Sequence, residues 1–293
     1  MVTPARRAGY RLFGPKFDYL LHTRPAEWPV MAAHTLVGYL LAVGLQGALG
    51  GERLGAALLG VALWVICLNG GTLAINSAYD QDEDDIAYLR RPPPPPRHLA
   101  AFAVALMLTG LLGSLALPVG YRLAYLTCMV LSVLYSVPPF RLKSVPGADW
   151  LINMWGFGTL TPYAGWAATG LPLRPAAALI LIGFGPLFAA LYPLTQIYQF
   201  EEDSRRGDRT LARTLGIKRS LLVSIWGAAL GFALFAGAAK LAGWGRGDVA
   251  SACCLGSDRC CRRICLGRLT ATLGRATAAP VYFENLPPSP ETA

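Results

Sequence analysis

Acidic residues are concentrated at positions 80–85, where five of six residues are Asp or Glu, directly after the apolar run 54–75. Asn76, Asp80 and Asp84 are four residues apart, so they share one face if the helix continues. Like charges at that spacing repel each other, which favours a cation between them. Carboxylate and amide oxygens suit Mg²⁺, which usually keeps water and substrate phosphates in its shell. The spacing therefore predicts a magnesium site, and the alternative is a solvated charged cap on a membrane helix.

A second acidic cluster lies in TQIYQFEEDSRRGDRTLARTLG, residues 195–216. Helical spacing again places amide and carboxylate side chains on one face, with arginines directly after them. Arg209 could clamp a phosphate. The candidate ligands and phosphate contacts of this stretch are Gln196, Gln199, Glu202, Asp203, Asp208 and Arg209.

A basic loop lies between the two acidic clusters, in YSVPPFRLKSVPGADW, residues 135–150. Arg141 and Lys143 are two residues apart between prolines, where they could neutralise phosphate oxygens. The alternative for this loop is anchoring to lipid headgroups. Together, two acidic sites, a basic loop and an apolar surrounding suggest a lipid diphosphate as the substrate.

The elements that must position these residues are membrane helices. The chain of 293 residues is 54% hydrophobic and 15% charged, with a mean hydropathy of +0.42, and its apolar residues form blocks of span length. We predict an all-α, polytopic membrane bundle. Its candidate spans are 28–49, 54–79, 98–118, 121–138, 150–170, 174–198 and 220–243.

Basic residues are distributed unequally between the two sides of these spans. The side that holds the N-terminus carries sixteen Lys and Arg before residue 240, and the opposite side carries three. The positive-inside rule then places the N-terminus and both acidic clusters in the cytoplasm. The net charge of +9 is thereby explained by topology, and we expect no nucleic-acid partner.

The segment from 247 to 293 differs in composition from the predicted membrane domain, 1–246. Five of the seven cysteines lie in SACCLGSDRCCRRICLGR, and no apolar run here is long enough to span a bilayer. Adjacent cysteine pairs without a nearby histidine argue against a zinc site. A disordered tail and out-of-frame translation are the remaining interpretations, and we favour the second.

The motifs together resemble the UbiA family of intramembrane prenyltransferases, in matching order over about residues 20–243. NSAYDQDEDD is similar to the family's first Asp-rich motif, and QFEEDSRRGDRTLARTLG to its second. YSVPPFRLK resembles the loop that contacts the diphosphate, and RPAEWP the entry into the first helix. One departure is Gln199, where many members have Asp. The predicted seven spans are also fewer than the family's usual nine.

The resemblance implies Mg²⁺-dependent transfer of a prenyl group from a prenyl diphosphate to a lipophilic acceptor within the membrane. The acceptor could be an aromatic quinone precursor, a carotenoid or a similar molecule. The protein is then expected in a bacterial inner membrane. Alternatives are a catalytically inactive truncated member of the family and a non-enzymatic transporter.

The resemblance also implies roles for individual residues. Asp80, Asp84 and Asp203 are the expected catalytic metal ligands, with Glu202 as a further ligand. Substrate contacts are expected from Asn76, Arg141, Lys143, Gln199, Asp208 and Arg209. Aromatic side chains would surround the allylic cation, and the candidates are Tyr135, Trp150, Trp155, Phe157, Tyr163 and Trp166. Each could instead be an interface or core aromatic.

Overall fold

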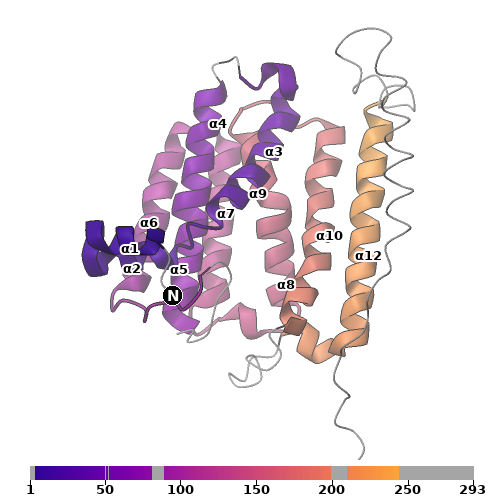
Figure 1. The fold of residues 1–293 in the computed structure, drawn as a ribbon. Helices are drawn as coiled ribbons and strands as arrows, with labels where there is room; N and C mark the ends of the chain where they lie inside the picture. The colour runs from indigo at the N-terminus through magenta and orange to yellow at the C-terminus, as the bar shows by residue number, and fades with distance from the viewer. Residues whose placement is uncertain (1–3, 50, 52, 81–88, 199–209, 244–293) are drawn as a thin grey trace, which may run out of the picture. The chain divides into compact units, whose positions relative to one another are not determined.

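The computed structural model describes residues 4–49, 51, 53–80, 89–198 and 210–243, and the regular elements of this part are all helical (Figure 1). Two short helices precede the bundle, α1 (Pro4–Phe13) and α2 (Phe17–His22), joined by the 3-10 turn η1 (Gly14–Lys16). The bundle is made of long rods, several of which change helical type along their length. Its elements are α3 (Trp28–Gly47), α4 (Arg53–Ala62), η2 (Leu63–Asn69), α5 (Gly70–Asp80), α6 (Leu99–Gly113), η3 (Ser114–Ala116), α7 (Val119–Ser136), η4 (Leu142–Ser144), α8 (Ala148–Asn153), η5 (Met154–Leu160), α9 (Thr161–Ala167), α10 (Pro175–Tyr198) and α12 (Leu211–Leu241).

Six helices of the described part are long and apolar enough to cross a membrane, in agreement with the predicted all-α membrane bundle. They correspond to six of the seven predicted spans. The chain alternates in direction along them, so that α5 ends, and α6 and α8 begin, at the same end of the bundle. We call this the Asp80 end.

The remaining predicted span, 150–170, is a continuous helical rod formed by α8, η5 and α9. Length and composition alone do not mark it as a span. The reason is its place in the bundle, since Thr161, Ala164 and Trp166 are all buried against other helices. A helix that faces protein need not be as apolar as one that faces lipid.

The last described helix begins nine residues before its predicted start at 220, because α12 opens at Leu211. Gly216 within it has a φ of 72°, outside the helical range, so the first residues form a separate turn. The rod proper therefore follows Gly216, close to the predicted position. α12 packs along α10 (Figure 1).

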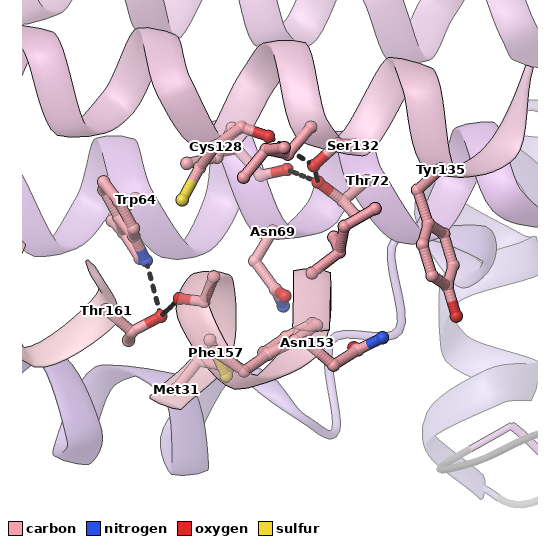
Figure 2. A pocket seen from close by; sticks show the side chains of 14 residues that line it. Met31, Trp64, Asn69, Thr72, Cys128, Ser132, Tyr135, Asn153, Phe157 and Thr161 are labelled. Atoms are coloured by element: carbon pink, nitrogen blue, oxygen red, sulfur yellow. Dashed lines mark hydrogen bonds between the residues drawn. The ribbon is translucent and has the colours of Figure 1, made fainter. Parts of the chain in front are cut away.

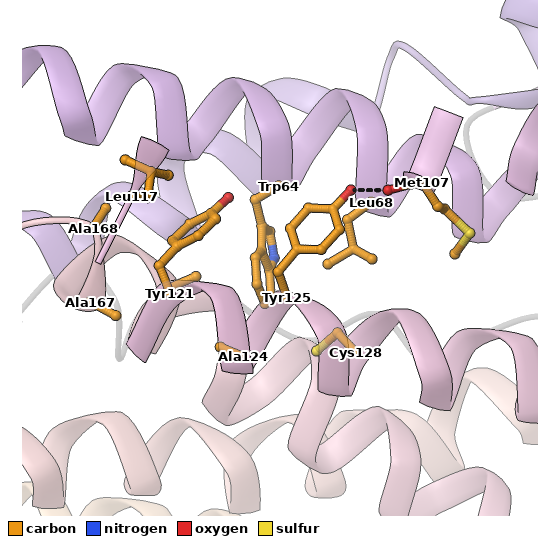
Figure 3. Packing of buried hydrophobic residues seen from close by; sticks show 11 residues of the cluster. Trp64, Leu68, Met107, Leu117, Tyr121, Ala124, Tyr125, Cys128, Ala167 and Ala168 are labelled. Carbon is orange, nitrogen blue, oxygen red and sulfur yellow. Dashed lines mark hydrogen bonds between the residues drawn. The ribbon is translucent and has the colours of Figure 1, made fainter. Parts of the chain in front are cut away.

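The core of the bundle is an aromatic cluster between η2, α6 and α7 (Figure 3). The rings of Trp64 and Tyr125 meet edge to face, with centroids 6.1 Å apart. The hydroxyls of the two core tyrosines donate to backbone carbonyls, Tyr121 to Gly60 at 2.7 Å and Tyr125 to Met107 at 3.1 Å. These bonds satisfy polar groups that are costly to bury and fix the rods in register.

Residues Met1–Ala242 form one compact unit, which contains every element named above. The predicted tail, 247–293, lies outside the described residues. Its nature and the predicted boundary at 246 stay predictions.

Candidate active site

The Asp80 end brings together the first acidic motif and the basic loop. The Lys143 ammonium forms an ion pair with the Asp80 carboxylate, and the Arg141 guanidinium lies 3.8 Å from the same oxygen. The side chains of Asp80 and Lys143 are only 6% and 9% exposed. Burial of this kind strengthens the attraction and makes either charge costly without the other.

The basic loop needs an unusual backbone to deliver these cations. Arg141 has a φ of 36°, in the left-handed region that non-glycine residues seldom adopt. Its amide donates to Val137 O at 3.1 Å, and the Ser144 hydroxyl donates to Arg141 O at 2.9 Å. The loop therefore turns sharply after α7, and η4 directs Lys143 inward. Strain held in this way is common at functional sites.

A polar stripe leads from Asp80 along one face of η2 and α5. Asn69, Thr72, Asn76 and Asp80 are spaced by three or four residues, the repeat that aligns side chains on a helix. Helix α7 contacts this stripe through serine hydroxyls. Ser132 and Thr72 share a hydrogen bond of 2.8 Å, and the Ser136 hydroxyl donates to Asn76 Oδ1 at 3.4 Å. The stripe therefore joins the charged end to the interior.

The interior end of the stripe opens into a pocket with about 510 Å³ of empty space (Figure 2). Apolar side chains dominate the lining, with a few polar groups. The lining residues are Met31, Trp64, Leu68, Asn69, Thr72, Cys128, Leu131, Ser132, Tyr135, Ile152, Asn153, Gly156, Phe157 and Thr161.

Two π-helical segments, η2 and η5, border this pocket. The Thr161 hydroxyl connects them, because it accepts from Trp64 Nε1 at 3.2 Å and donates to Gly156 O at 2.8 Å. A π-helix widens the turn and leaves carbonyls without their usual partners, and such segments are frequent at functional sites. Here the widened turns make room at the pocket wall.

Asn69 differs from the other polar groups of the pocket. Its side chain lines the cavity and is only 4% exposed, and Figure 2 shows it directed toward the space between Phe157 and Asn153. Its Nδ2 makes no hydrogen bond of good geometry with any residue in the described part of the chain. The amide nevertheless acts on the Glu27 carboxyl, where it opposes the rise in pKa that burial causes, so it is a polar contact of the pocket and not an isolated donor. Asn69 was not among the residues predicted from the sequence, although a polar residue inside an apolar run was the available signal.

The predicted aromatic lining is only partly found at the pocket. Tyr135 and Phe157 line it, and Trp64, which was not predicted, joins them. The other candidates lie elsewhere: Trp155 is exposed, and Trp150 and Trp166 donate their indole N–H groups to the backbone at Ala189 and Leu171. Tyr163 packs against two core clusters. Sequence position alone does not tell which face of a rod is turned to the cavity.

Gln196, predicted to share a face with the second metal site, has a structural role instead. Its Nε2 donates to the buried Asp149 carboxylate, and its Oε1 accepts from the Ala212 amide at 3.1 Å. Asp149 also accepts from the amides of Gly147 at 2.8 Å and Leu211 at 3.3 Å. This cluster, which we call the Asp149 clamp, ties α8, α10 and the start of α12 together.

The remaining predicted metal ligands and substrate contacts lie outside the described residues. They are Asp84, Gln199, Glu202, Asp203, Asp208 and Arg209. Within the described residues, no three His, Cys, Asp or Glu side chains form a metal-binding group. The oxygens of Asp80 and Asn76 are nevertheless the hard donors that Mg²⁺ prefers, and they lie one helical turn apart. These two residues fit a magnesium site completed by other ligands.

Comparison with known proteins identifies the class of protein that this bundle and pocket represent. The sequence model of the UbiA prenyltransferase family matches residues 31–259. The chain belongs to this family, and the predicted prenyltransferase class is confirmed.

Relatives and solved structures agree with this assignment. A lycopene elongase/hydratase of Halobacterium salinarum is 30% identical over 220 residues, covering 72% of this chain and 76% of the relative. A 2-acyl-4-prenylphloroglucinol 6-prenyltransferase of Humulus lupulus is 30% identical over 175 residues, covering 56% and 42%. The fold is similar to that of a UbiA homolog from Archaeoglobus fulgidus bound to GPP and Mg²⁺, with a TM-score of 0.63 and 24% identity over 76% of this chain and 78% of that one.

Proposed function

We propose that this chain transfers a prenyl group from an allylic prenyl diphosphate to a lipophilic acceptor, in a Mg²⁺-dependent reaction. The supporting observation is the position of Asp80, Arg141 and Lys143 at one end of a polar stripe whose other end opens into an apolar pocket. A molecule with an anionic head and a hydrocarbon tail matches that gradient. The diphosphate would lie at the Asp80 end and the prenyl chain in the pocket.

Asp80 and Asn76 would hold Mg²⁺, and we propose Asp84, Glu202 and Asp203 as further ligands. The metal would neutralise diphosphate oxygens. Arg141 and Lys143 are already placed to stabilise the same negative charge as it develops on the leaving group. Gln199, Asp208 and Arg209 are proposed as further substrate contacts.

In the proposed reaction the allylic C–O bond breaks, and its electron pair leaves with the diphosphate. The resulting allylic cation needs a site without water and with electron-rich groups. The rings of Tyr135, Phe157 and Trp64 line the pocket where the cation would form. Electrons of the acceptor then form the new C–C bond, and loss of a proton completes the transfer.

The acceptor belongs to one of two classes. The Asn69 amide in the pocket lining favours an acceptor that carries an oxygen, such as a phenol or a quinone precursor. The lycopene elongase/hydratases among the relatives favour a carotenoid.

The experiment is to reconstitute the chain in lipid vesicles with Mg²⁺, a labelled allylic diphosphate and each acceptor class in turn. Mass spectrometry of the products should show one acceptor enlarged by the prenyl mass. Release of diphosphate without any prenylated product would place the acceptor outside both classes. If the chain forms no product and releases no diphosphate, the result would favour the alternative that this chain is an inactive member of the family.

We also propose that the protein lies in the bacterial inner membrane with the Asp80 end in the cytoplasm, on the basis of the unequal distribution of Lys and Arg. Val145 lies at this end and is 43% exposed, whereas Leu173, 44% exposed, lies at the opposite end. In a background without native cysteines, an impermeant thiol reagent added to intact cells should label Leu173→Cys and leave Val145→Cys unlabelled. The reverse pattern would overturn the orientation.

A further inference from the structure

Helix α1 is a basic, amphipathic element that stands outside the bundle. Arg7 and Arg11 are exposed and four residues apart, so they form one stripe of the helix. The stripe beside it is apolar and equally open, with Leu12 78% exposed, and Phe13 at the helix end is 58% exposed. Lys16, in the turn that follows, is also exposed. A short element with exposed cations beside exposed apolar side chains is typical of a membrane interface.

The opposite side of α1 is fixed to the protein. The Tyr10 hydroxyl donates to the Asp18 carboxylate at 2.6 Å, and the Tyr10 ring meets Phe17 edge to face at 5.2 Å. Gly9 is buried against the Phe17 ring, where a Cβ would have no room. α1 is therefore held on α2, and its basic and apolar stripes are exposed; Figure 1 shows the two short helices together at one side of the bundle.

A third contact connects α1 to the segment that enters α6. The Arg6 guanidinium donates to Arg90 O at 3.1 Å and to Arg91 O at 2.9 Å. These carbonyls belong to the segment that follows the first acidic motif and enters α6. Arg6 is thus used inside the protein, while Arg7, Arg11 and Lys16 form no ion pair with any described acidic side chain.

We propose that α1 lies in the headgroup layer at the Asp80 end and binds anionic phospholipid through Arg7, Arg11 and Lys16. Leu12 and Phe13 would then enter the boundary of the acyl chains. The three cations complement the negative charge of a leaflet that contains phosphatidylglycerol. Because this attraction falls off within about 10 Å, α1 must lie at the membrane surface to benefit from it. Through Arg6, binding of α1 to the lipid also holds the segment at Arg90 and Arg91 that enters α6.

A quenching experiment tests this directly and does not depend on enzymatic activity. A fluorophore is attached at Leu12→Cys, in a background without native cysteines, and the protein is placed in vesicles that contain brominated phosphatidylglycerol or brominated phosphatidylcholine. We expect stronger quenching by the anionic lipid. The triple variant Arg7→Gln, Arg11→Gln, Lys16→Gln should lose this preference. Each cation removed should lower the affinity of α1 for the anionic lipid about fivefold. Arg53→Gln, an exposed arginine at the opposite end, is the matched control and should change nothing.

A second measurement keeps the native cysteines, so it does not depend on whether the cysteine-free protein folds. Lipids that remain bound to the detergent-purified protein are identified by mass spectrometry, for the wild type, the triple variant and Arg53→Gln. Phosphatidylglycerol should be depleted only in the triple variant. Equal quenching by both lipids, or equal retention of phosphatidylglycerol in all three proteins, would overturn the proposal.

Discussion

The ammonium of Lys143 pairs with the carboxylate of Asp80, and both side chains are more than nine-tenths buried. The two residues come from the loop after α7 and from the end of α5, so folding of both rods is needed to form the pair. Each ion is desolvated in the other's presence. The losses in the free energy of unfolding caused by substituting Asp80 and Lys143 should therefore not be additive.

Asp80→Asn should destabilise the fold as well as abolish activity. It removes the Asp80 charge that pairs with the buried Lys143 ammonium, at a cost of about 3–5 kcal/mol. The double variant Asp80→Asn, Lys143→Met should recover much of that stability without recovering activity. A double-mutant cycle on thermal unfolding in detergent measures the coupling. Additive losses would show that the pair does not behave as one unit.

The Asp149 clamp should matter for stability rather than for chemistry. Asp149→Asn replaces one accepting oxygen by a donor, which then faces either the Gly147 amide at Oδ1 or the Leu211 amide and Gln196 Nε2 at Oδ2. We expect a loss of about 1–3 kcal/mol, the cost of buried groups left without partners. Thermal unfolding should show this loss. Asn153→Ala on the same helix, which removes only a bond to the carbonyl of Asp149, serves as the control and should cost less.

The pocket variants should separate two steps of the proposed reaction. Asn69→Leu removes the donor directed into the cavity, so the KM for an oxygen-bearing acceptor should rise about tenfold, the value of one hydrogen bond to an uncharged group. Release of diphosphate without acceptor should not change. Phe157→Ala should instead slow that release, because it removes a ring beside the expected cation. Equal effects of both variants on both steps would contradict this division.

Glu27, directly before α3, makes stability depend on pH. Burial raises its pKa, and Arg24 and the Asn69 amide oppose the rise. Because the folded protein then holds the proton more tightly than the unfolded chain, this contribution to stability is present below the ordinary glutamate pKa. It is lost as the pH rises through the folded-state pKa. Glu27→Gln should remove this part of the decline in melting temperature between acidic and neutral pH. An unchanged pH profile would show that another group is responsible.

Much of the fold follows from local signals in the sequence. Each rod is an apolar block, and the block length matches the bilayer, so spans could be located to within a few residues. The start of α12 was missed because Leu211–Gly216 forms a separate turn before the apolar rod, and hydropathy detects only the rod. The helical spacing of Asn76 and Asp80 was equally local, and α5 continues to Asp80 as that spacing requires.

The rest of the site depends on contacts between rods. The hydrogen bonds of Ser132 to Thr72 and of Trp64 to Thr161 join segments far apart in the chain, and no spacing rule predicts them. The π-helical turns arise from the same packing. Gln196 shows the opposite error: helical spacing grouped it with metal ligands, but tertiary structure uses both ends of its amide in the Asp149 clamp.

The most direct test of the account is Mg²⁺-dependent release of diphosphate from an allylic prenyl diphosphate by the reconstituted chain. Wild type, Asp80→Asn and the control Asp18→Asn are compared at equal amounts of folded protein, with Mg²⁺ and with a chelator. The account predicts release by the wild type and by Asp18→Asn only with Mg²⁺, and a loss of at least about a hundredfold in Asp80→Asn. Release by Asp80→Asn at a near-normal rate, or release by the wild type in the presence of the chelator, would contradict it.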